Sequence, residues 1–369
     1  MYEEKVVDLL REKGVNFIVS LPCDRTKDLC MVLEDKFRYI TISREEDGVG
    51  ICSGLSLLKA YPLLQMQSSG LGNSLNALMT LPALYGLSLP ILASWRGYYQ
   101  EKISAQIPFN EKIPELLTLY NLPYTIIRTS DDINLIGDVI DDAYQNKRPH
   151  VALISPQVWE GDSSTSRCFF QSRNRTLNLS YLGEFKQPMM QRADAINVIA
   201  EQFSNEYVIS NIGVPSKELY AARDRDKNFY MLGSYTQATP IGLGVALATD
   251  KRVVVLDGDG SLLGTSILPV VASSASKNLT IICLDNGVYG STGDQCSPAY
   301  HTVDLELIAR ASGIERTVKV HTPDELHDAF MENPDDGPRF IHVIIAPGNS
   351  PAPNIPLTPH EIRNRFSSS

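Results

Sequence analysis

Residues 252–286 read RVVVLDGDGSLLGTSILPVVASSASKNLTIICLDN, and this stretch decides the fold of the chain. The apolar, β-branched run 253–256 is typical of a strand buried on both faces, and it ends abruptly in an Asp-Gly-Asp-Gly turn. A stretch of helical length follows, and a second apolar run, 278–284, ends at Asp285 and Asn286. This order predicts two parallel neighbouring strands whose carboxyl ends lie side by side.

Oxygen ligands gather at these two strand ends. Asp259 follows the first strand, and Asn286 follows the second. Mg²⁺ prefers oxygen ligands and usually takes one or two carboxylates together with phosphate oxygens. Gly258 and Gly260 would let the backbone approach a diphosphate closely. The sequence therefore predicts a site for Mg²⁺ and a diphosphate.

Three other motifs begin with similar residues. An EF-hand loop that starts at Asp257 needs glycine at 262 and glutamate at 268, but both positions are leucine. A dinucleotide fingerprint that starts at Gly258 needs glycine at 263, where leucine also stands. An aspartyl-phosphate phosphatase of the haloacid dehalogenase type stays open as an alternative, with Asp257 as its nucleophile. Asn286 argues against it, because the second acidic cluster of such enzymes is not evident there.

The spacing from Gly258 to Asn286 resembles the thiamine-diphosphate motif, which opens with Gly-Asp-Gly and closes with a pair of asparagines. Here the first position of the pair is Asp285. The resemblance implies that Asp259, the Asn286 side chain and the Val288 carbonyl hold Mg²⁺, which in turn holds the diphosphate of the cofactor.

A thiamine enzyme also needs a glutamate that hydrogen-bonds the aminopyrimidine ring of the cofactor and so activates it. Residues 39–57, YITISREEDGVGICSGLSL, offer Glu45 at the start of a helix that follows a strand. By resemblance this glutamate stands nine positions before a helix glycine, which is Gly54. Glu46 faces elsewhere, because adjacent helical residues do not share a face. The alternative is that both are helix-start carboxylates favoured by the helix dipole.

Three segments resemble the short 3-sulfopyruvate and phosphonopyruvate decarboxylases. They are MQSSGLGN at 66–73, SWRG at 94–97 and NFYMLGS at 228–234. Relatives often place a bulky aliphatic residue and a glycine after the Gly-Ser pair to bend the cofactor, whereas this chain has Tyr235-Thr236. The residues that the resemblance places around the cofactor are Gly70, Asn73, Gly233, Ser234, Tyr235, Gly258, Asp259, Gly260, Ser261 and Asn286. For Ser234 and Ser261 the alternative is an ordinary turn or helix-cap role.

Of the two families, the sulfopyruvate decarboxylases fit better. Their two subunits would correspond to residues 1–165 and 190–369, joined here by a linker at 166–189. The resemblance implies decarboxylation of 3-sulfopyruvate to sulfoacetaldehyde and carbon dioxide, a step toward coenzyme M, with phosphonopyruvate as the alternative substrate. A partner that binds the cofactor without catalysing a reaction is a further alternative.

The charge balance raises the question of how an acidic protein binds an anionic 2-oxo acid. The net charge of −10 argues against a nucleic-acid partner and requires a local concentration of positive charge. Arg96 is the first candidate because it follows the predicted strand 89–95, at the edge where open α/β sheets bind ligands. Arg25 and Lys102 are weaker candidates, and Gln106 would orient the substrate. For each cation the alternative is a solvated surface role, and for Gln106 it is that of a plain loop amide.

Two α/β halves are predicted from the alternation of strands and helices along the chain. Each half is expected to form a doubly wound, three-layer αβα domain with a parallel sheet. Because Glu45 and the Mg²⁺ motif fall in different halves, the site should lie between domains, and the family resemblance implies at least a homodimer. The predicted strands are 16–21, 39–43, 63–67, 89–95, 124–128, 151–155, 207–210, 228–232, 252–256, 279–284, 317–320 and 340–345.

The remaining features narrow the cellular setting. No apolar run is long enough for a membrane helix, and the chain begins with a charged amphipathic helix, so a cytoplasmic location without membrane partners is expected. The six cysteines form no C-x-x-C pair, which argues against a zinc site or a disulfide framework.

Overall fold

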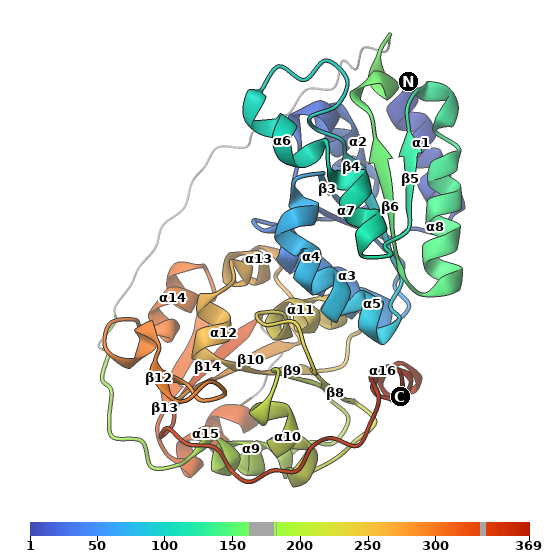
Figure 1. Ribbon diagram of the computed structural model, residues 1–369. Coiled ribbons are helices and arrows are strands. Elements are labelled where there is room, and N and C mark those ends of the chain that lie inside the picture. Colours follow the sequence, from blue (N-terminus) through green and yellow to red (C-terminus); the bar gives the residue numbers. More distant parts are fainter. Residues whose placement is uncertain (162–180, 182, 333–336) are drawn as a thin grey trace.

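The computed structural model describes residues 1–161, 181, 183–332 and 337–369 (Figure 1). The predicted linker falls largely outside these residues, as does Cys168. The boundaries at 165 and 190 therefore stay a prediction. The four buried cysteines and the exposed Cys296 are free. Among the described residues, no helix is both long and apolar enough to cross a membrane.

The first half of the chain forms a six-stranded sheet in the order β2-β1-β3-β4-β6-β5. Every neighbouring pair is parallel, as predicted for strands that alternate with helices. The carboxyl ends of all six strands therefore lie along one edge. The strands are β1 (Phe17–Ser20), β2 (Arg38–Thr41), β3 (Pro62–Gln67), β4 (Leu89–Ser94), β5 (Tyr124–Ile127) and β6 (Pro149–Ile154).

Helices cover both faces of this sheet (Figure 1). One face carries α1 (Tyr2–Glu12), α2 (Lys27–Lys36) and α8 (Leu135–Asn146). Their apolar residues recur every three or four positions, which places one stripe of each helix against the strands. The other face carries α3 (Glu45–Leu57), α4 (Gly70–Thr80), α5 (Pro82–Tyr85) and α7 (Ile113–Leu119). Short turns complete the half: η1 (Asp24–Thr26), η2 (Ser104–Gln106), α6 (Ile107–Asn110), η3 (Ser130–Asp132) and η4 (Pro156–Trp159).

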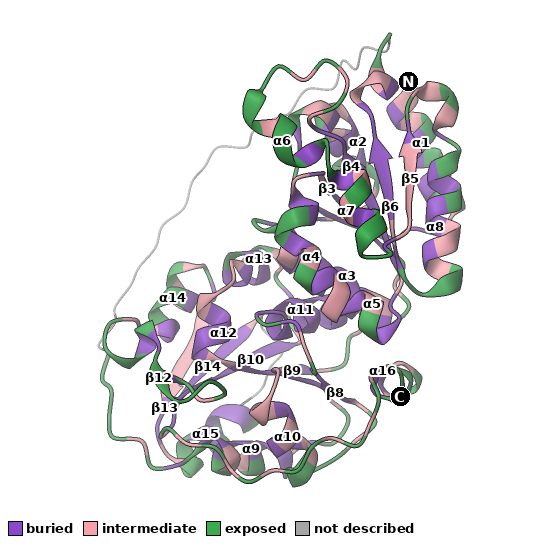
Figure 2. Ribbon diagram, viewed as in Figure 1, coloured by how far each residue is buried: buried purple, intermediate pink, exposed green. Residues whose placement is uncertain are grey.

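The second half repeats this plan with the strand order β13-β14-β10-β9-β7-β8, again all parallel. Figure 2 shows that the central strands of both sheets are buried while the outer helices expose one side, and the strands β2, β5 and β13 at the sheet edges are only partly buried. The strands are β7 (Tyr207–Ser210), β8 (Asn228–Tyr230), β9 (Val253–Gly258), β10 (Leu279–Asp285), β13 (Arg316–Val320) and β14 (Arg339–Ile344). The outer helices are α9 (Arg192–Ala200), α10 (Val214–Ala222) and α15 (Pro323–Met331). The helices on the other face are α11 (Ala238–Ala248), α13 (Ile267–Ser274) and α14 (Leu305–Ala311).

The structure confirms the predicted fold class and each of the twelve predicted strands, with ends that differ by a few residues at most. One element was not predicted: a short hairpin of β11 (Val288–Tyr289) and β12 (Gln295–Cys296), with η5 (Pro298–Tyr300) after it. Strands of two residues are too short to show an alternating pattern. The C-terminal helix α16 (Pro359–Ser368) reaches across to the first domain, where Arg363 Nη1 donates to the Gly86 carbonyl at 2.7 Å.

The two domains meet where α3 crosses α11, between the two sheets (Figure 1). A Cβ atom added to Gly54 would collide with the Ile241 carbonyl, and one added to Gly244 would collide with the Ile51 carbonyl. Only glycine therefore allows these two backbones to touch.

Asp47 joins the same two domains through polar contacts. Its Oδ1 accepts a hydrogen bond from Thr265 Oγ1 at 2.5 Å, and its Oδ2 accepts one from the Ser266 backbone at 3.2 Å. The side chain is fully buried, and this burial raises the pKa of Asp47 from 3.8 to about 6. The charged carboxylate therefore costs stability at neutral pH.

Replacing Asp47 by asparagine should make the stability of the ligand-free protein less dependent on pH. A raised folded-state pKa contributes stability that is complete below the unfolded-state value and is lost as the pH rises through about 6. Asparagine does not titrate, so the stability of Asp47→Asn relative to the parent should increase by about 2 kcal/mol between about pH 4 and about pH 8. Urea unfolding at the two pH values measures this change. The exposed Asp8→Asn is the control, and an equal difference at both pH values would contradict the prediction.

Candidate active site

A cavity of about 360 Å³ opens at the carboxyl ends of β9 and β10. Leu284 of β10 pairs with Gly258 of β9, so the residues that follow the two strands lie next to each other. Asp257 to Ser261 and Asn286 line the cavity, together with Val288 and its neighbours. The structure thus brings together the two strand ends that the sequence predicted.

Asp259 presents a nearly buried carboxylate at the start of α12 (Asp259–Leu263). Ser297 Oγ donates a short hydrogen bond to its Oδ2. Burial, reinforced by repulsion from Asp285, raises the pKa of Asp259 to about 6. Such a carboxylate lacks a compensating cation, and a divalent metal would provide one.

The oxygens of the following loop complete the predicted metal site. Asn286 lies in the cavity wall, with its Oδ1 accepting a hydrogen bond from the Val288 backbone at 3.1 Å. Gly287 has a φ of +67°, which turns the chain sharply between the two predicted ligands. One carboxylate, one amide oxygen and one carbonyl match the oxygen donors that Mg²⁺ takes beside phosphate. These residues fit Mg²⁺, and their role as ligands stays a prediction.

Asp285, which departs from the expected asparagine, faces away from this group. His342 Nε2 lies 2.7 Å from its Oδ2, and the Gly287 backbone donates to its Oδ1 at 2.9 Å. His342 Nδ1 is also 3.5 Å from Asp304 Oδ1, and Asp304 forms an ion pair with Lys319. Burial alone would lower the pKa of His342, but the hydrogen bonds with Asp285 and Asp304 raise it. The extra carboxylate is therefore compensated by a buried histidine.

Two further features suit a diphosphate. Ser261 Oγ is buried and has no hydrogen-bond partner among the described residues, so it is free to donate to a phosphate oxygen. A Cβ atom added to Gly260 would lie 2.6 Å from the Tyr289 ring, so a side chain does not fit here and the glycine backbone stays uncovered. Asp257, by contrast, is 1% exposed and accepts hydrogen bonds from Thr239 Oγ1 at 2.6 Å and from the Gly258 backbone at 2.9 Å. Both of its oxygens are occupied, which argues against a nucleophilic role.

The segment from Gly233 to Thr236 lies between the cavity and the first domain. Ser234 Oγ is 2.6 Å from Thr80 Oγ1 of α4, and a Cβ atom added to Gly233 would lie 3.2 Å from Thr80. Tyr235 lines the cavity and donates from its hydroxyl to the Gly260 carbonyl at 2.5 Å. Thr236 has a φ of +74°, a conformation that favours glycine. The backbone thus adopts a glycine-like bend without the glycine of many relatives.

In the first domain, Glu45 is held by a neighbouring helix. Asn73 Nδ2 donates to its Oε2 at 3.2 Å, and a Cβ atom added to Gly70 would lie 2.5 Å from its Cγ. Glu45 is 8% exposed, whereas Glu46 forms an ion pair with Arg44 at 2.8 Å. The two carboxylates diverge as predicted. Glu45 contacts a second helix, which a plain helix-start carboxylate would not need to do. Its catalytic role stays a prediction.

Glu45 does not line the cavity described above, whose lining residues all belong to the second domain. The nearby Asp47 contacts Thr265 and Ser266, which follow α12, so the start of α3 does reach the second domain. Among the described residues, the lining of this cavity therefore does not include the predicted pyrimidine end of the site.

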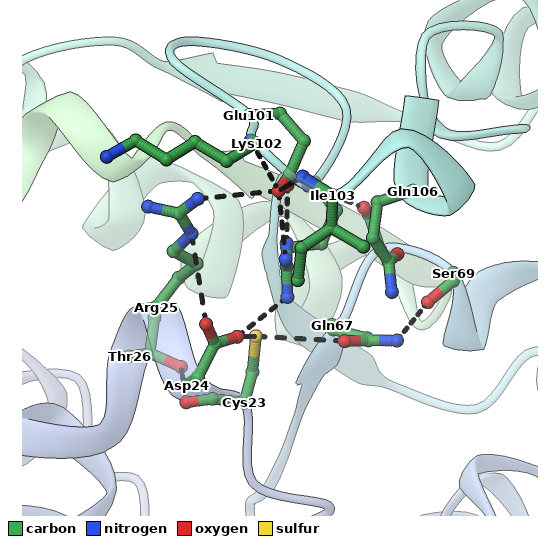
Figure 3. Close-up of polar contacts among 12 residues, drawn as sticks. Cys23, Asp24, Arg25, Thr26, Gln67, Ser69, Glu101, Lys102, Ile103 and Gln106 are labelled. Atoms are coloured by element: carbon green, nitrogen blue, oxygen red, sulfur yellow. Dashed lines mark hydrogen bonds and ion pairs between the residues drawn. The ribbon is translucent and has the colours of Figure 1, made fainter. Parts of the chain in front are cut away.

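The predicted substrate-binding cations form one cluster beside β4 (Figure 3). Arg96 is 3% exposed and donates to Glu101 through Nε at 2.7 Å and Nη2 at 3.1 Å, and to Asp24 through Nη1 at 2.7 Å. Arg25 Nη2 lies 3.4 Å from Glu101 Oε1. Arg96 is therefore a buried, paired cation rather than a solvated surface residue. Lys102 is exposed, and its side chain has no ion pair among the described residues. Gln106 Oε1 accepts a hydrogen bond from Asn110 at 3.2 Å.

Two charged residues of these sites were missed in the sequence. Arg192 lines the diphosphate cavity and forms a buried, two-bond ion pair with Glu218, at 2.7 and 3.2 Å. It also donates to Asn349 at 2.7 Å, and Asn349 Nδ2 donates to the Gly290 carbonyl of the cavity wall at 2.8 Å. The available signal was its position in the first turn of α9, where the helix dipole disfavours a cation. Glu101 is the other residue, and it follows Arg96 by five positions in a loop without any period.

Comparisons with known proteins agree with this arrangement. The family model "Thiamine pyrophosphate enzyme, C-terminal TPP binding domain" matches residues 215–343, and thiamine pyrophosphate is another name for thiamine diphosphate. A sulfopyruvate decarboxylase of Methanosarcina acetivorans is 44% identical over 99% of this chain and 96% of its own length. A phosphonopyruvate decarboxylase of Streptomyces hygroscopicus is 32% identical over 96% of this chain and 90% of its own length.

Separate subunits match the two halves. A sulfopyruvate decarboxylase β subunit of Methanothermobacter thermautotrophicus is 43% identical over 48% of this chain and 94% of its own length. An α subunit from Methanococcus maripaludis is 36% identical over 43% of this chain and 97% of its own length. Among solved structures, benzoylformate decarboxylase from Polynucleobacter necessarius has a TM-score of 0.71 at 14% identity, and covers 95% of this chain and 99% of its own. At that identity the likeness concerns the fold.

Proposed function

Because this chain belongs to the sulfopyruvate decarboxylase family of thiamine-diphosphate enzymes, we propose that it converts 3-sulfopyruvate to sulfoacetaldehyde and carbon dioxide with the help of Mg²⁺. The observation that carries the proposal is the meeting of Asp259 and Asn286 at the ends of two paired strands, in a cavity that also contains the unpartnered Ser261 hydroxyl. Phosphonopyruvate is the second candidate substrate, since relatives of both kinds span nearly the whole chain.

Each group of the chain would have a separate task. Bound thiamine diphosphate supplies the electron sink that allows a 2-oxo acid to lose carbon dioxide. Asp259, Asn286 and the Val288 carbonyl would hold Mg²⁺. Ser261 would donate to a diphosphate oxygen. Glu45 would share a proton with a ring nitrogen of the aminopyrimidine, which Asn73 helps by fixing the carboxylate.

A second copy of the chain is part of the proposal. We infer that Glu45 comes from the facing domain of another chain, because the residues that line the diphosphate cavity all belong to the second domain. Exposed apolar side chains are available for such a contact, among them Leu232 and Tyr235 in the second domain, and Ile103 and Phe109 in the first. Burying them between two copies would remove apolar surface from water. The smallest assembly with complete sites is then a homodimer.

A coupled assay for carbon dioxide tests the proposed reaction. We expect release from sulfopyruvate, in the presence of thiamine diphosphate and Mg²⁺ only, with little release from pyruvate. Turnover of phosphonopyruvate alone would move the assignment to the second candidate. No turnover of any keto acid, despite cofactor binding, would indicate a non-catalytic partner. Hydrolysis of a general phosphate ester with an aspartyl phosphate trapped at Asp257 would indicate the phosphatase.

A further inference from the structure

The Glu101 carboxylate lies in a complete anion-binding site made by the protein itself (Figure 3). Its side chain is 4% exposed. Oε2 accepts hydrogen bonds from Arg96 Nε at 2.7 Å and from the Gly97 backbone at 3.3 Å. Oε1 accepts from Arg96 Nη2 and from the backbones of Lys102 and Ile103, each at 3.1 Å, and from Arg25 Nη2 at 3.4 Å. Six N–H groups therefore converge on one carboxylate.

These donors form a set that also suits a tetrahedral anion. Two guanidinium groups provide charge and planar pairs of N–H groups, and three backbone N–H groups provide further donors. A sulfonate or phosphonate has three oxygens to share among them. In the described structure, however, Glu101 and Asp24 balance the charges of Arg96 and Arg25. A dianion would therefore gain little binding free energy until Glu101 moved away from the arginines.

The cluster and the predicted catalytic carboxylate belong to the same domain. Arg96 follows β4, and Gln67, the last residue of the adjacent β3, donates a hydrogen bond to Ser69. Gly70, the next residue, contacts Glu45. Both groups therefore lie along the carboxyl edge of the same sheet, which is the edge where open α/β sheets bind ligands.

The segment that carries Glu101 lies at the surface. Tyr98, Lys102 and Ile103 are exposed, and Gly97 has a φ of +68°. Moving Glu101 requires rearrangement of this loop and leaves the sheet intact. The carboxylate itself is strongly held, because the hydrogen bonds from Arg96 keep the pKa of Glu101 well below its usual value. Only a ligand whose own anionic group accepts these hydrogen bonds would displace the Glu101 carboxylate at low cost.

We propose that the Glu101 carboxylate occupies the place of the substrate sulfonate in the ligand-free protein, and that the sulfonate binds by displacing it. This inference rests on the proposed function, because it takes the 2-oxo acid to carry a second anionic group. It explains how an acidic protein selects a dianion: a keto acid that ends in a methyl group cannot replace the hydrogen bonds of Glu101. Glu101 is then a specificity-determining residue. Once its carboxylate has moved away, Arg96 and Arg25 bind the sulfonate.

Sulfate binding to the holoenzyme tests the idea without turnover. In Glu101→Gln the two arginines lose their competing carboxylate, so sulfate should bind at least ~10-fold more tightly than in the parent, measured by calorimetry and by the shift in melting temperature. Glu160→Gln is the matched control, because Glu160 lines the same surface pocket as Arg25 and Asp24, and among the described residues its carboxylate accepts a hydrogen bond from the Tyr99 hydroxyl at 3.0 Å and none from an arginine. Unchanged or weaker sulfate binding in Glu101→Gln would overturn the proposal and give Glu101 a purely structural role.

Two further measurements keep the test decisive. Adding Arg25→Gln to Glu101→Gln should remove most of the gain in sulfate affinity, and retention of the whole gain would contradict the proposed site. If Glu101→Gln does not fold, Arg25→Gln alone should weaken competitive inhibition by sulfate, and equal inhibition would overturn the proposal. Absence of sulfopyruvate turnover by the parent enzyme would instead refute the proposed function, and it is scored separately from sulfate binding.

Discussion

Glu45→Gln is expected to abolish decarboxylation while leaving cofactor binding partly intact. Loss of a general acid–base group typically lowers the rate by about 10²- to 10⁴-fold. Glutamine keeps the shape of the side chain and an oxygen that can accept the hydrogen bond from Asn73. The diphosphate cavity contains no part of the first domain, so the grip on the diphosphate should remain. Carbon dioxide release at saturating cofactor, together with calorimetric titration of thiamine diphosphate, separates the two effects.

Glu46→Gln is the control for this experiment. Glu46 is the next residue on the helix, but it forms an ion pair with Arg44 and diverges from Glu45. Its replacement should leave turnover close to that of the parent. If Glu45→Gln turned over at the parental rate, the assignment of Glu45 as the activating carboxylate would be refuted.

Asp259→Asn should remove Mg²⁺-dependent binding of the cofactor, with an affinity loss on the order of 100-fold or more, because the variant loses the charged ligand of the predicted metal site. The folded ligand-free protein should persist, because asparagine still accepts the hydrogen bond from Ser297 and no longer repels Asp285. Titration of thiamine diphosphate with and without Mg²⁺ measures the loss, and thermal unfolding of the apo form checks the fold.

Asp294→Asn serves as the control for the metal site. Asp294 is an exposed carboxylate between the two strands of the β11–β12 hairpin, so its removal changes the local charge equally. The Asp294→Asn variant should bind the cofactor as tightly as the parent protein does. An Asp259→Asn variant that still bound the cofactor in a Mg²⁺-dependent way would move the metal site elsewhere.

The two inactive variants together show where each site is assembled. If Glu45 of one chain faces Asp259 of another, mixing and re-equilibrating Glu45→Gln with Asp259→Asn produces hybrid dimers with one intact site each. Random pairing should then restore roughly a quarter of the parental activity. No recovery in demonstrably mixed dimers would mean that each site is built within one chain.

The positions of the central strands could be predicted because strands that are buried on both faces require continuous apolar runs, which a sequence shows directly. The same reasoning located Asp259 and Asn286, since adjacent parallel strands end at the same edge. It also predicted that Glu45 and Glu46 would diverge. Each of these inferences depends on periodicity and on neighbours along one or two elements.

Other features depend on contacts between residues far apart in the chain. His342 compensates Asp285 from a strand that begins more than fifty residues later. The hydrogen bonds of Arg192 with Glu218 and Asn349 join three separate segments of the chain. Glu101 is close to Arg96 in sequence, yet its contact with Arg25 depends on tertiary packing. No local pattern encodes such pairings, because the partners are selected by the folded surface.

Local sequence patterns were enough to predict two doubly wound domains, the strand ends that bear the predicted metal ligands, and the helix start that bears Glu45. Hydrophobic periodicity and turn chemistry act over a few residues, so these features can be recognised locally. Packing in three dimensions was needed to show that Glu101 pairs with Arg96, that a buried histidine compensates Asp285, and that the residues lining the diphosphate cavity all belong to the second domain. The reason is electrostatic and steric, since the environment of a buried charge depends on every chain segment packed around it.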